Sequence, residues 1–206
     1  MKEFFVTVGI IAFIVIVLVV IWNVYSRMLS KKIMKEGRNK KNFTFNYLST
    51  RFSRLNTIKN VNLVVKDSSA QSGKSVADIG LVFVNRGGIF VIDTVPGSGY
   101  IEVNERSEWN RVINDKSYTF EDPIIKNGYR AKKMKQFLRD EEIVNIPVHN
   151  LVVFSGKRVK FSKRLNGLIT ADELTEYMID LNKYRIMSKS EIRDVIKLIK
   201  YSLADN

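Results

Sequence analysis

Asp78 and Asp93 lie on the two arms of a predicted β-hairpin. The two apolar strands are joined by a turn centred on Arg86 and Gly87, a sequence typical of tight hairpin turns. This register pairs Asp78 with Val95, and because side chains alternate along a strand, both aspartates lie on one face as diagonal neighbours, about 7 Å apart. Two carboxylates at that spacing can share a divalent cation. The alternative is that both aspartates only end their strands and face water.

The composition excludes most other site chemistry. The 206 residues include no cysteine and a single histidine, so thiol nucleophiles, zinc fingers, iron–sulfur clusters and disulfides are excluded. His149 precedes an apolar strand without a recognisable serine or aspartate partner, and we interpret it as a surface or hydrogen-bonded histidine. Gly73-Lys74-Ser75 is not a phosphate-binding loop, because Ser68 replaces the first glycine and a predicted strand follows.

Strands and helices alternate in the segments that position the aspartates. Beside the hairpin strands at 79–84 and 89–92, the patterns predict strands at 61–65, 100–103, 148–154 and 168–169, and helices at 42–55, 124–139, 171–181 and 189–202. The first helix has Phe45, Leu48, Phe52 and Leu55 at spacings of 3, 4 and 3, which predicts a buried stripe. Ser188 and Glu191 form a capping box before the last helix. The expected fold class is α/β, an α+β mixed sheet flanked by helices.

The residues around the hairpin resemble the NERD (nuclease-related) domain family. The resemblance rests on residues 77–84 (ADIGLVFV), 88–95 (GIFVIDTV), 98–101 (SGYI), Trp109 and 120–127 (FEDPIIKN), and it spans about residues 42 to 202. This family is similar to the restriction-endonuclease-like nucleases. The resemblance therefore implies a mixed sheet flanked by helices, and a hairpin on which two acids hold Mg²⁺ while a lysine contacts the phosphate or the water.

Carried over to this chain, the resemblance implies that Asp78 and Asp93 hold the metal. Val95 stands where the family has its lysine, and Thr44-Phe45 replaces an early Gly-Glu. A valine side chain neither binds phosphate nor orients water, so we expect impaired catalysis. The alternative is that Lys126 replaces the missing amine, and the catalytic residues are then Asp78, Asp93 and Lys126.

The helix predicted at 124–139 is rich in cations. Its candidate contacts to nucleic-acid phosphates are Arg130, Lys132, Lys133 and Lys135. The same charges are also compatible with a solvated helix surface.

A run of 19 uncharged residues, Phe4 to Trp22, predicts a transmembrane helix. Such a helix is roughly 28 Å long, close to the ~30 Å of a bilayer's hydrocarbon core. It continues into an aromatic pair, Trp22 and Tyr25, rather than a cleavage site of small residues, so we expect an uncleaved anchor.

Basic residues collect directly after this run. Between residues 24 and 66 there are eleven basic side chains and one acidic side chain, so this segment contributes +10 to the net charge of +13. The positive-inside rule then places the N-terminus outside and the C-terminal domain in the cytoplasm. We expect such a segment to bind anionic lipid headgroups, and nucleic acid is the second explanation for its charge. The candidate contacts are Lys31, Lys32, Lys35, Arg38, Lys40 and Lys41.

Three segments are therefore predicted: a transmembrane anchor at 1–23, a basic juxtamembrane segment at 24–41 and a NERD-like domain at 42–206. We expect a single-pass cell-membrane protein whose cytoplasmic domain is catalytically impaired and binds nucleic acid or a partner. One alternative is a Mg²⁺-dependent nuclease with a relocated lysine. The other is a membrane-associated scaffold that binds anionic lipid or protein.

Overall fold

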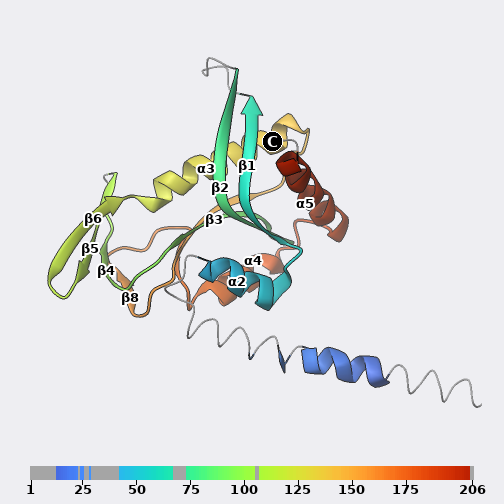
Figure 1. The fold of residues 1–206 in the computed structure, drawn as a ribbon, viewed down its shortest axis with the longest axis horizontal. Coiled ribbons are helices and arrows are strands. Elements are labelled where there is room, and N and C mark those ends of the chain that lie inside the picture. The colour runs from blue at the N-terminus through green and yellow to red at the C-terminus, as the bar shows by residue number, and fades with distance from the viewer. Residues whose placement is uncertain are drawn as a thin grey trace, which may run out of the picture.

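A five-stranded mixed sheet forms the centre of the domain (Figure 1). The computed structural model describes residues 13–22, 24–25, 28, 42–66, 73–104 and 107–204. The strand order is β1 (Thr57–Lys66), β2 (Lys74–Asn85), β3 (Gly88–Val95), β7 (Val148–Phe154) and β9 (Leu168–Thr170). The first three strands are antiparallel, whereas β7 and β9 run parallel to β3. The predicted α/β class with a mixed sheet flanked by helices is confirmed.

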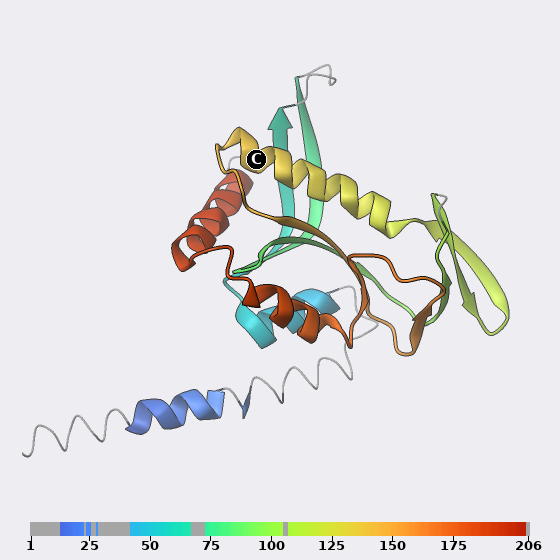
Figure 2. The ribbon, with the colours of Figure 1, turned by 180° about the vertical axis from the view of Figure 1, so that it is seen from behind.

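A second sheet of four strands lies beyond the N-terminal end of α3 (Pro123–Asp140), as Figure 2 shows. Its order is β6 (Lys116–Glu121), β5 (Glu108–Ile113), β4 (Gly99–Glu102) and β8 (Val159–Phe161). Only β4 was expected from the sequence. The β5–β6 hairpin turns at Asn114 and Asp115, which both have positive φ (48° and 61°), as a type I′ turn requires.

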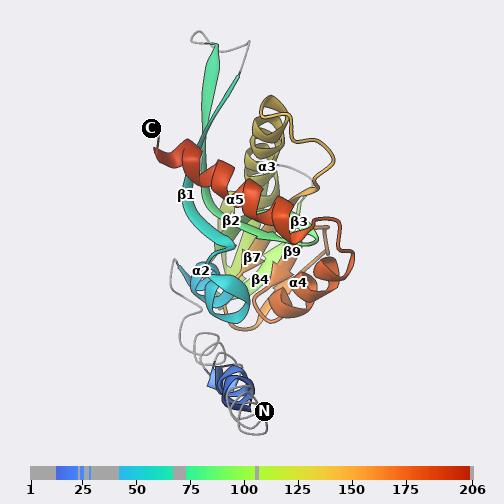
Figure 3. The same cartoon turned by 90° about the vertical axis from the view of Figure 1, so that its right-hand side faces the viewer.

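Helices cover both faces of the central sheet. On one face, α3 and α5 (Lys189–Ala204) pack on the aliphatic side chains of β1, β2 and β3. On the other, α2 (Phe43–Leu48) and α4 (Leu174–Lys183) pack on β2, β3 and β7 and lie side by side (Figure 3). The hydroxyl groups of Tyr47 and Thr175 form a hydrogen bond that joins these two helices. The part of the hairpin in which β2 pairs with β3 therefore lies between helical layers.

The stripe predicted for the first helix is partly wrong. The structure buries Phe43, Tyr47 and Leu48, whereas Leu55 is 73% exposed. The reason is that α2 passes into a π-helical turn, η1 (Ser49–Ser53), and ends. The wider π turn changes the helical period, so the 3.6-residue spacing no longer places Leu55 on the buried face.

Two helix starts follow the local signals in the sequence. At α5, the Ser188 N–H donates to Glu191 Oε2 (2.7 Å) and the Glu191 N–H donates to Ser188 Oγ (3.2 Å), so the predicted capping box is confirmed. At α3, Asp122 Oδ1 accepts from the backbone N–H groups of Ile124 (2.7 Å) and Ile125 (3.1 Å). These caps fix where both helices begin beside the sheet.

No helix within the described ranges is long and apolar enough to cross a membrane. Of the predicted span from Phe4 to Trp22, residues 4–12 lie outside those ranges. The described part, residues 13–22, is helical and every one of its side chains is exposed. The basic residues predicted to contact lipid between Lys31 and Lys41 also lie outside the described residues.

Candidate functional site

The β2–β3 hairpin has the predicted register, but its pairing stops before the aspartates. Leu81 pairs with Ile92, in the register of a turn at Arg86 and Gly87, and this is the last pair described between the two strands. Asp78 pairs instead with Asn62 of β1. The expected pairing of Asp78 with Val95 is therefore not formed. The prediction that the two carboxylates are diagonal neighbours on this hairpin is wrong.

The cause is a bend at the point where β2 leaves β3. Asn60 of β1 has φ +51°, a left-handed conformation that asparagine tolerates better than most residues. It stands between the pairs Lys59–Leu81 and Val61–Ile79, at the level of Gly80. Figures 1 and 3 show that the outer halves of β1 and β2 project beyond the rest of the sheet as a two-stranded arm. Asp78 belongs to this arm, where its side chain is exposed.

Asp93, near the end of β3, lies beside Arg130 of α3. Its Oδ2 lies 3.6 Å from Nη1 of Arg130, and the two side chains are only 32% and 23% exposed. The Asp93 Oδ1 accepts a hydrogen bond from the Thr94 N–H (3.0 Å). Arg130 therefore offsets the charge of Asp93.

A small pocket of about 160 Å³ surrounds Asp93. Its lining comes from α2, β1, β2 and β3: Asn42, Phe45, Lys59, Asn60, Gly80, Leu81, Ile92, Asp93 and Thr94. Lys59 Nζ lies 3.9 Å from the centre of the Phe45 ring, a cation–π contact. Thr94 Oγ1 donates to Thr44 Oγ1 (2.7 Å), so an uncharged hydrogen bond occupies the region where the resemblance implies Gly-Glu.

The described residues do not assemble a typical Mg²⁺ ligand set. Within them no three histidine, cysteine, aspartate or glutamate side chains are grouped so as to hold a metal ion. Asp93 is the one carboxylate that lines the pocket, and it forms an ion pair with Arg130, which is not part of the lining. Because Mg²⁺ binds through carboxylate and other oxygen ligands, the positive charge of Arg130 beside Asp93 opposes its binding.

Among the described ion pairs, Lys126 is joined to Glu121 and not to Asp78 or Asp93. Its Nζ forms an ion pair with Glu121 Oε2 at 2.9 Å, on the solvent side of the α3 N-terminus. This hydrogen bond and the charge of Lys126 lower the pKa of Glu121. Arg130, one helical turn further along α3, is the cation that the structure brings to Asp93.

A family model described as "Nuclease-related domain" matches residues 36–155, more than half of the chain. The chain belongs to the nuclease-related domain (NERD) family. Comparisons with curated proteins and with solved structures gave no match. The family match includes Asp78, Asp93 and α3, and it ends just after β7, so that β8, β9, α4 and α5 lie beyond it.

The cations of α3 divide between the surface and the interior of this NERD domain. Lys133 is only 8% exposed and donates a hydrogen bond to Ser75 Oγ (2.8 Å), so it is unsuited to contact a nucleic acid. Lys132, Lys135 and Arg139 are exposed. Their spacing of three and four residues places them on one outward face of the helix. This face, which we call the α3 basic face, is the candidate interface that the structure retains.

Asn127 is the buried residue that fixes α3 to the sheet. It is fully buried, and its Nδ2 donates to the carbonyl oxygen of Val91 in β3 (2.8 Å) and to Asn150 Oδ1 in β7 (2.7 Å). The sequence shows it only as the last residue of FEDPIIKN, without a signal for its two partners. By holding α3 across β3 and β7, Asn127 also places Arg130 beside Asp93.

A second group of cations was missed in the sequence analysis. Residues 155–164 contain five basic residues and no acidic one. In the structure Lys157, Arg158 and Lys160, at the start of β8, are exposed. The charge run itself was a signal that could have identified this surface.

Proposed function

We propose that this protein is a membrane-anchored NERD domain that binds nucleic acid and has lost ordinary metal-dependent cleavage. The observation that carries the proposal is the ion pair between Asp93 and Arg130. In addition, Val95 stands where the family has its lysine. In this proposal the central sheet with α3 is a restriction-endonuclease-like core. This core retains a basic surface for nucleic acid but lacks the lysine that completes the family's catalytic residues.

The chemistry of phosphodiester hydrolysis supports impairment. Cleavage needs an activated water and stabilisation of the negative charge that develops on the phosphate. A guanidinium such as that of Arg130 binds phosphate well, but it is always protonated and cannot accept a proton from water. The ion pair with Arg130 engages the one carboxylate that lines the pocket, which supports impaired hydrolysis.

The α3 basic face supports the binding part of the proposal. Each cation that neutralises a phosphate releases condensed counterions, and this release provides most of the sequence-independent affinity. Lys132, Lys135 and Arg139 project from one helix of 18 residues, so three such contacts require no further ordering of the backbone.

Membrane anchoring is part of the same proposal. The exposed, wholly apolar side chains of residues 13–22 are typical of a segment that needs a non-aqueous environment. The basic residues at 24–41 fit the anionic cytoplasmic leaflet, with the N-terminus outside and the NERD domain in the cytoplasm.

Nucleic-acid binding is tested with the full chain in nanodiscs of neutral lipid. We expect fluorescence anisotropy to detect binding of single-stranded or duplex oligonucleotides at ~50 mM salt, and that binding weakens steeply by ~200 mM. Absence of binding at the lower salt concentration contradicts the proposal. Binding to anionic vesicles in a flotation assay, without oligonucleotide binding, favours the scaffold alternative instead.

Cleavage is tested on the same oligonucleotides with Mg²⁺ and with Mn²⁺. We expect the wild-type chain and Asp93→Ala to show the same background activity, because Asp93 holds Arg130 rather than a metal ion. Cleavage by the wild type that is lost in Asp93→Ala establishes the alternative, a Mg²⁺-dependent nuclease, and contradicts impairment.

The variant Val95→Lys asks whether the missing lysine alone explains the impairment. We expect no gain of Mg²⁺-dependent cleavage, because Asp78 lies on the projecting arm and Asp93 is paired with Arg130. The measurement is single-turnover cleavage of a labelled oligonucleotide, with Val95→Met as a control of similar length but no charge. A gain in Val95→Lys alone contradicts the separation of the two aspartates.

A further inference from the structure

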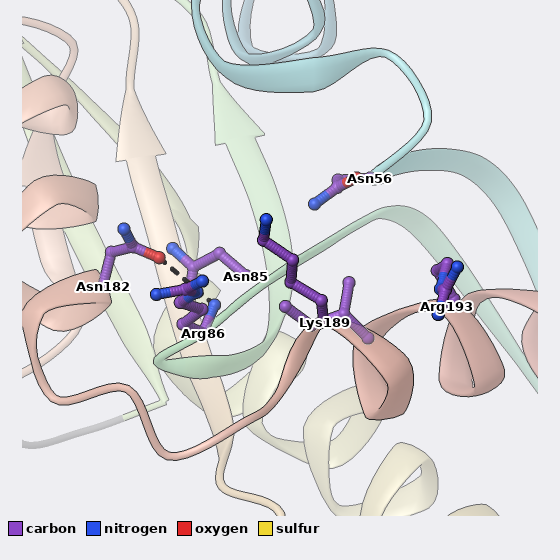
Figure 4. Close-up of a pocket in the computed structure, with 7 residues that line it drawn as sticks. Asn56, Asn85, Arg86, Asn182, Lys189 and Arg193 are labelled. Atoms are coloured by element: carbon purple, nitrogen blue, oxygen red, sulfur yellow. Dashed lines mark hydrogen bonds between the residues drawn. The ribbon is translucent and has the colours of Figure 1, made fainter.

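An open pocket of about 500 Å³ lies at the closed end of the β2–β3 hairpin, the end opposite to Asp93 (Figure 4). Its lining comes from the start of β1, the hairpin turn, the end of α4 and the first turns of α5: Asn56, Asn85, Arg86, Asn182, Lys189, Ile192 and Arg193. Four of these residues follow residue 155 and so lie outside the family match. We call this site the hairpin-end pocket.

Three cations and no carboxylate line the hairpin-end pocket. Figure 4 shows Lys189 extending from α5 between Asn85 and Asn56, with Arg86 on one side and Arg193 on the other. None of the ion pairs between described side chains involves these three cations. The nearest such pair along the chain joins Lys183 to Asp180. Three positive charges around one cavity repel each other, so an anion within it is stabilised by all three.

The asparagines of the pocket are held by backbone hydrogen bonds. Asn182 Oδ1 accepts from the Arg86 N–H (3.2 Å), and Asn85 Oδ1 accepts from the Gly87 N–H (2.7 Å). Asn56 Nδ2 donates to the carbonyl oxygen of Val84 (2.9 Å). Because the oxygen of Asn182 is engaged with the turn, its amide nitrogen is the group left to donate to a ligand.

The hairpin turn that forms one wall is rigidly packed. A side chain at Gly87 would lie 2.4 Å from the carbonyl oxygen of Leu181, so the turn lies directly against the end of α4. The Met187 N–H donates to the carbonyl oxygen of Arg86 (2.9 Å), which ties the α4–α5 connection to the same turn. The backbone of this wall is therefore organised before any ligand binds, and this lowers the entropic cost of binding.

We infer that the hairpin-end pocket binds a small molecule that carries a diphosphate group. Two adjacent phosphates present several anionic oxygens to three cations, and arginine binds such oxygens in a bidentate manner. The volume is within the range of pockets for small ligands, about 300–1,000 Å³. The inference does not rest on nucleic-acid binding, because the pocket and Asp93 lie at opposite ends of the hairpin.

The test is isothermal titration calorimetry of the full chain in neutral nanodiscs with pyrophosphate, and separately with ADP. We expect binding at low salt, and about tenfold weaker binding for Lys189→Gln and Arg193→Gln, because each removes one charge-assisted contact. Lys200→Gln, an exposed cation further along α5, is the matched control and is expected to bind as the wild type does. Binding of ADP but not of pyrophosphate still supports a diphosphate-bearing ligand, with a contribution from the nucleoside.

Asn182→Asp provides an independent variant that keeps the fold. A carboxylate accepts the Arg86 N–H bond as the amide does, but it adds a negative charge to the pocket. We expect it to abolish pyrophosphate binding and to leave oligonucleotide binding unchanged. The inference is overturned if the wild type binds neither pyrophosphate nor ADP, or if Lys200→Gln weakens binding as much as Arg193→Gln does.

Discussion

Replacement of Lys132, Lys135 and Arg139 together by glutamine is expected to weaken oligonucleotide binding about 100-fold at ~0.1 M salt. The reason is that each lost phosphate contact removes a counterion-release contribution of about 0.7 decade on a single strand at this salt concentration, which is roughly two decades for three contacts. The slope of log K against log salt should also become shallower, by about two to three. Both quantities come from anisotropy titrations of the full chain over a series of salt concentrations.

The matched control removes the same charge from another surface. Lys157, Arg158 and Lys160, replaced together by glutamine, lower the net charge equally but lie at the start of β8. If the α3 basic face is the interface, this control changes affinity only slightly, through the long-range field. A large loss in the control with none in the α3 variant places the interface at β8 and contradicts our assignment. Equal small effects in both contradict a localised phosphate interface.

Asn127→Leu is expected to lower the free energy of unfolding by roughly 3 kcal/mol. Leucine has a similar size, so the main effect is electrostatic. The carbonyl oxygen of Val91 and Oδ1 of Asn150 each lose the hydrogen bond from Nδ2, and the loss of hydrogen bonds in a buried region is costly. Because Asn127 also positions α3, Arg130 should lose its place beside Asp93.

Denaturant unfolding of the full chain in detergent, followed by tryptophan fluorescence, measures this change. Trp109 is a suitable reporter because it is fully buried where the second sheet meets the central one. Lys132→Leu, an exposed site on the same helix, is the control and should change stability by less than about 0.5 kcal/mol. A loss as small as the control's in Asn127→Leu contradicts the role that we assign to the buried amide.

The features that could be predicted from sequence are those that depend on near neighbours. The hairpin register follows from the turn sequence around Arg86 and Gly87. Helix α5 begins after the capping box that Ser188 and Glu191 form. The β5–β6 hairpin was missed because its strands are short and polar, although Asn114 and Asp115 favour its turn. Leu55 was misplaced because a π turn interrupts a regular period.

The candidate site depends on contacts between distant segments. The sequence by itself determined which residues carry charge, that Val95 replaces a lysine, and that a long apolar segment with a basic flank precedes the domain. Only the tertiary structure decided that the described pairing of β2 with β3 ends at Leu81, whereas its pairing with β1 continues past Asp78. It also decided that Arg130, and not Lys126, meets Asp93. The physical reason is that turns and caps are set by hydrogen bonds within a few residues, whereas the partner of a strand or a cation is set by packing across the whole fold.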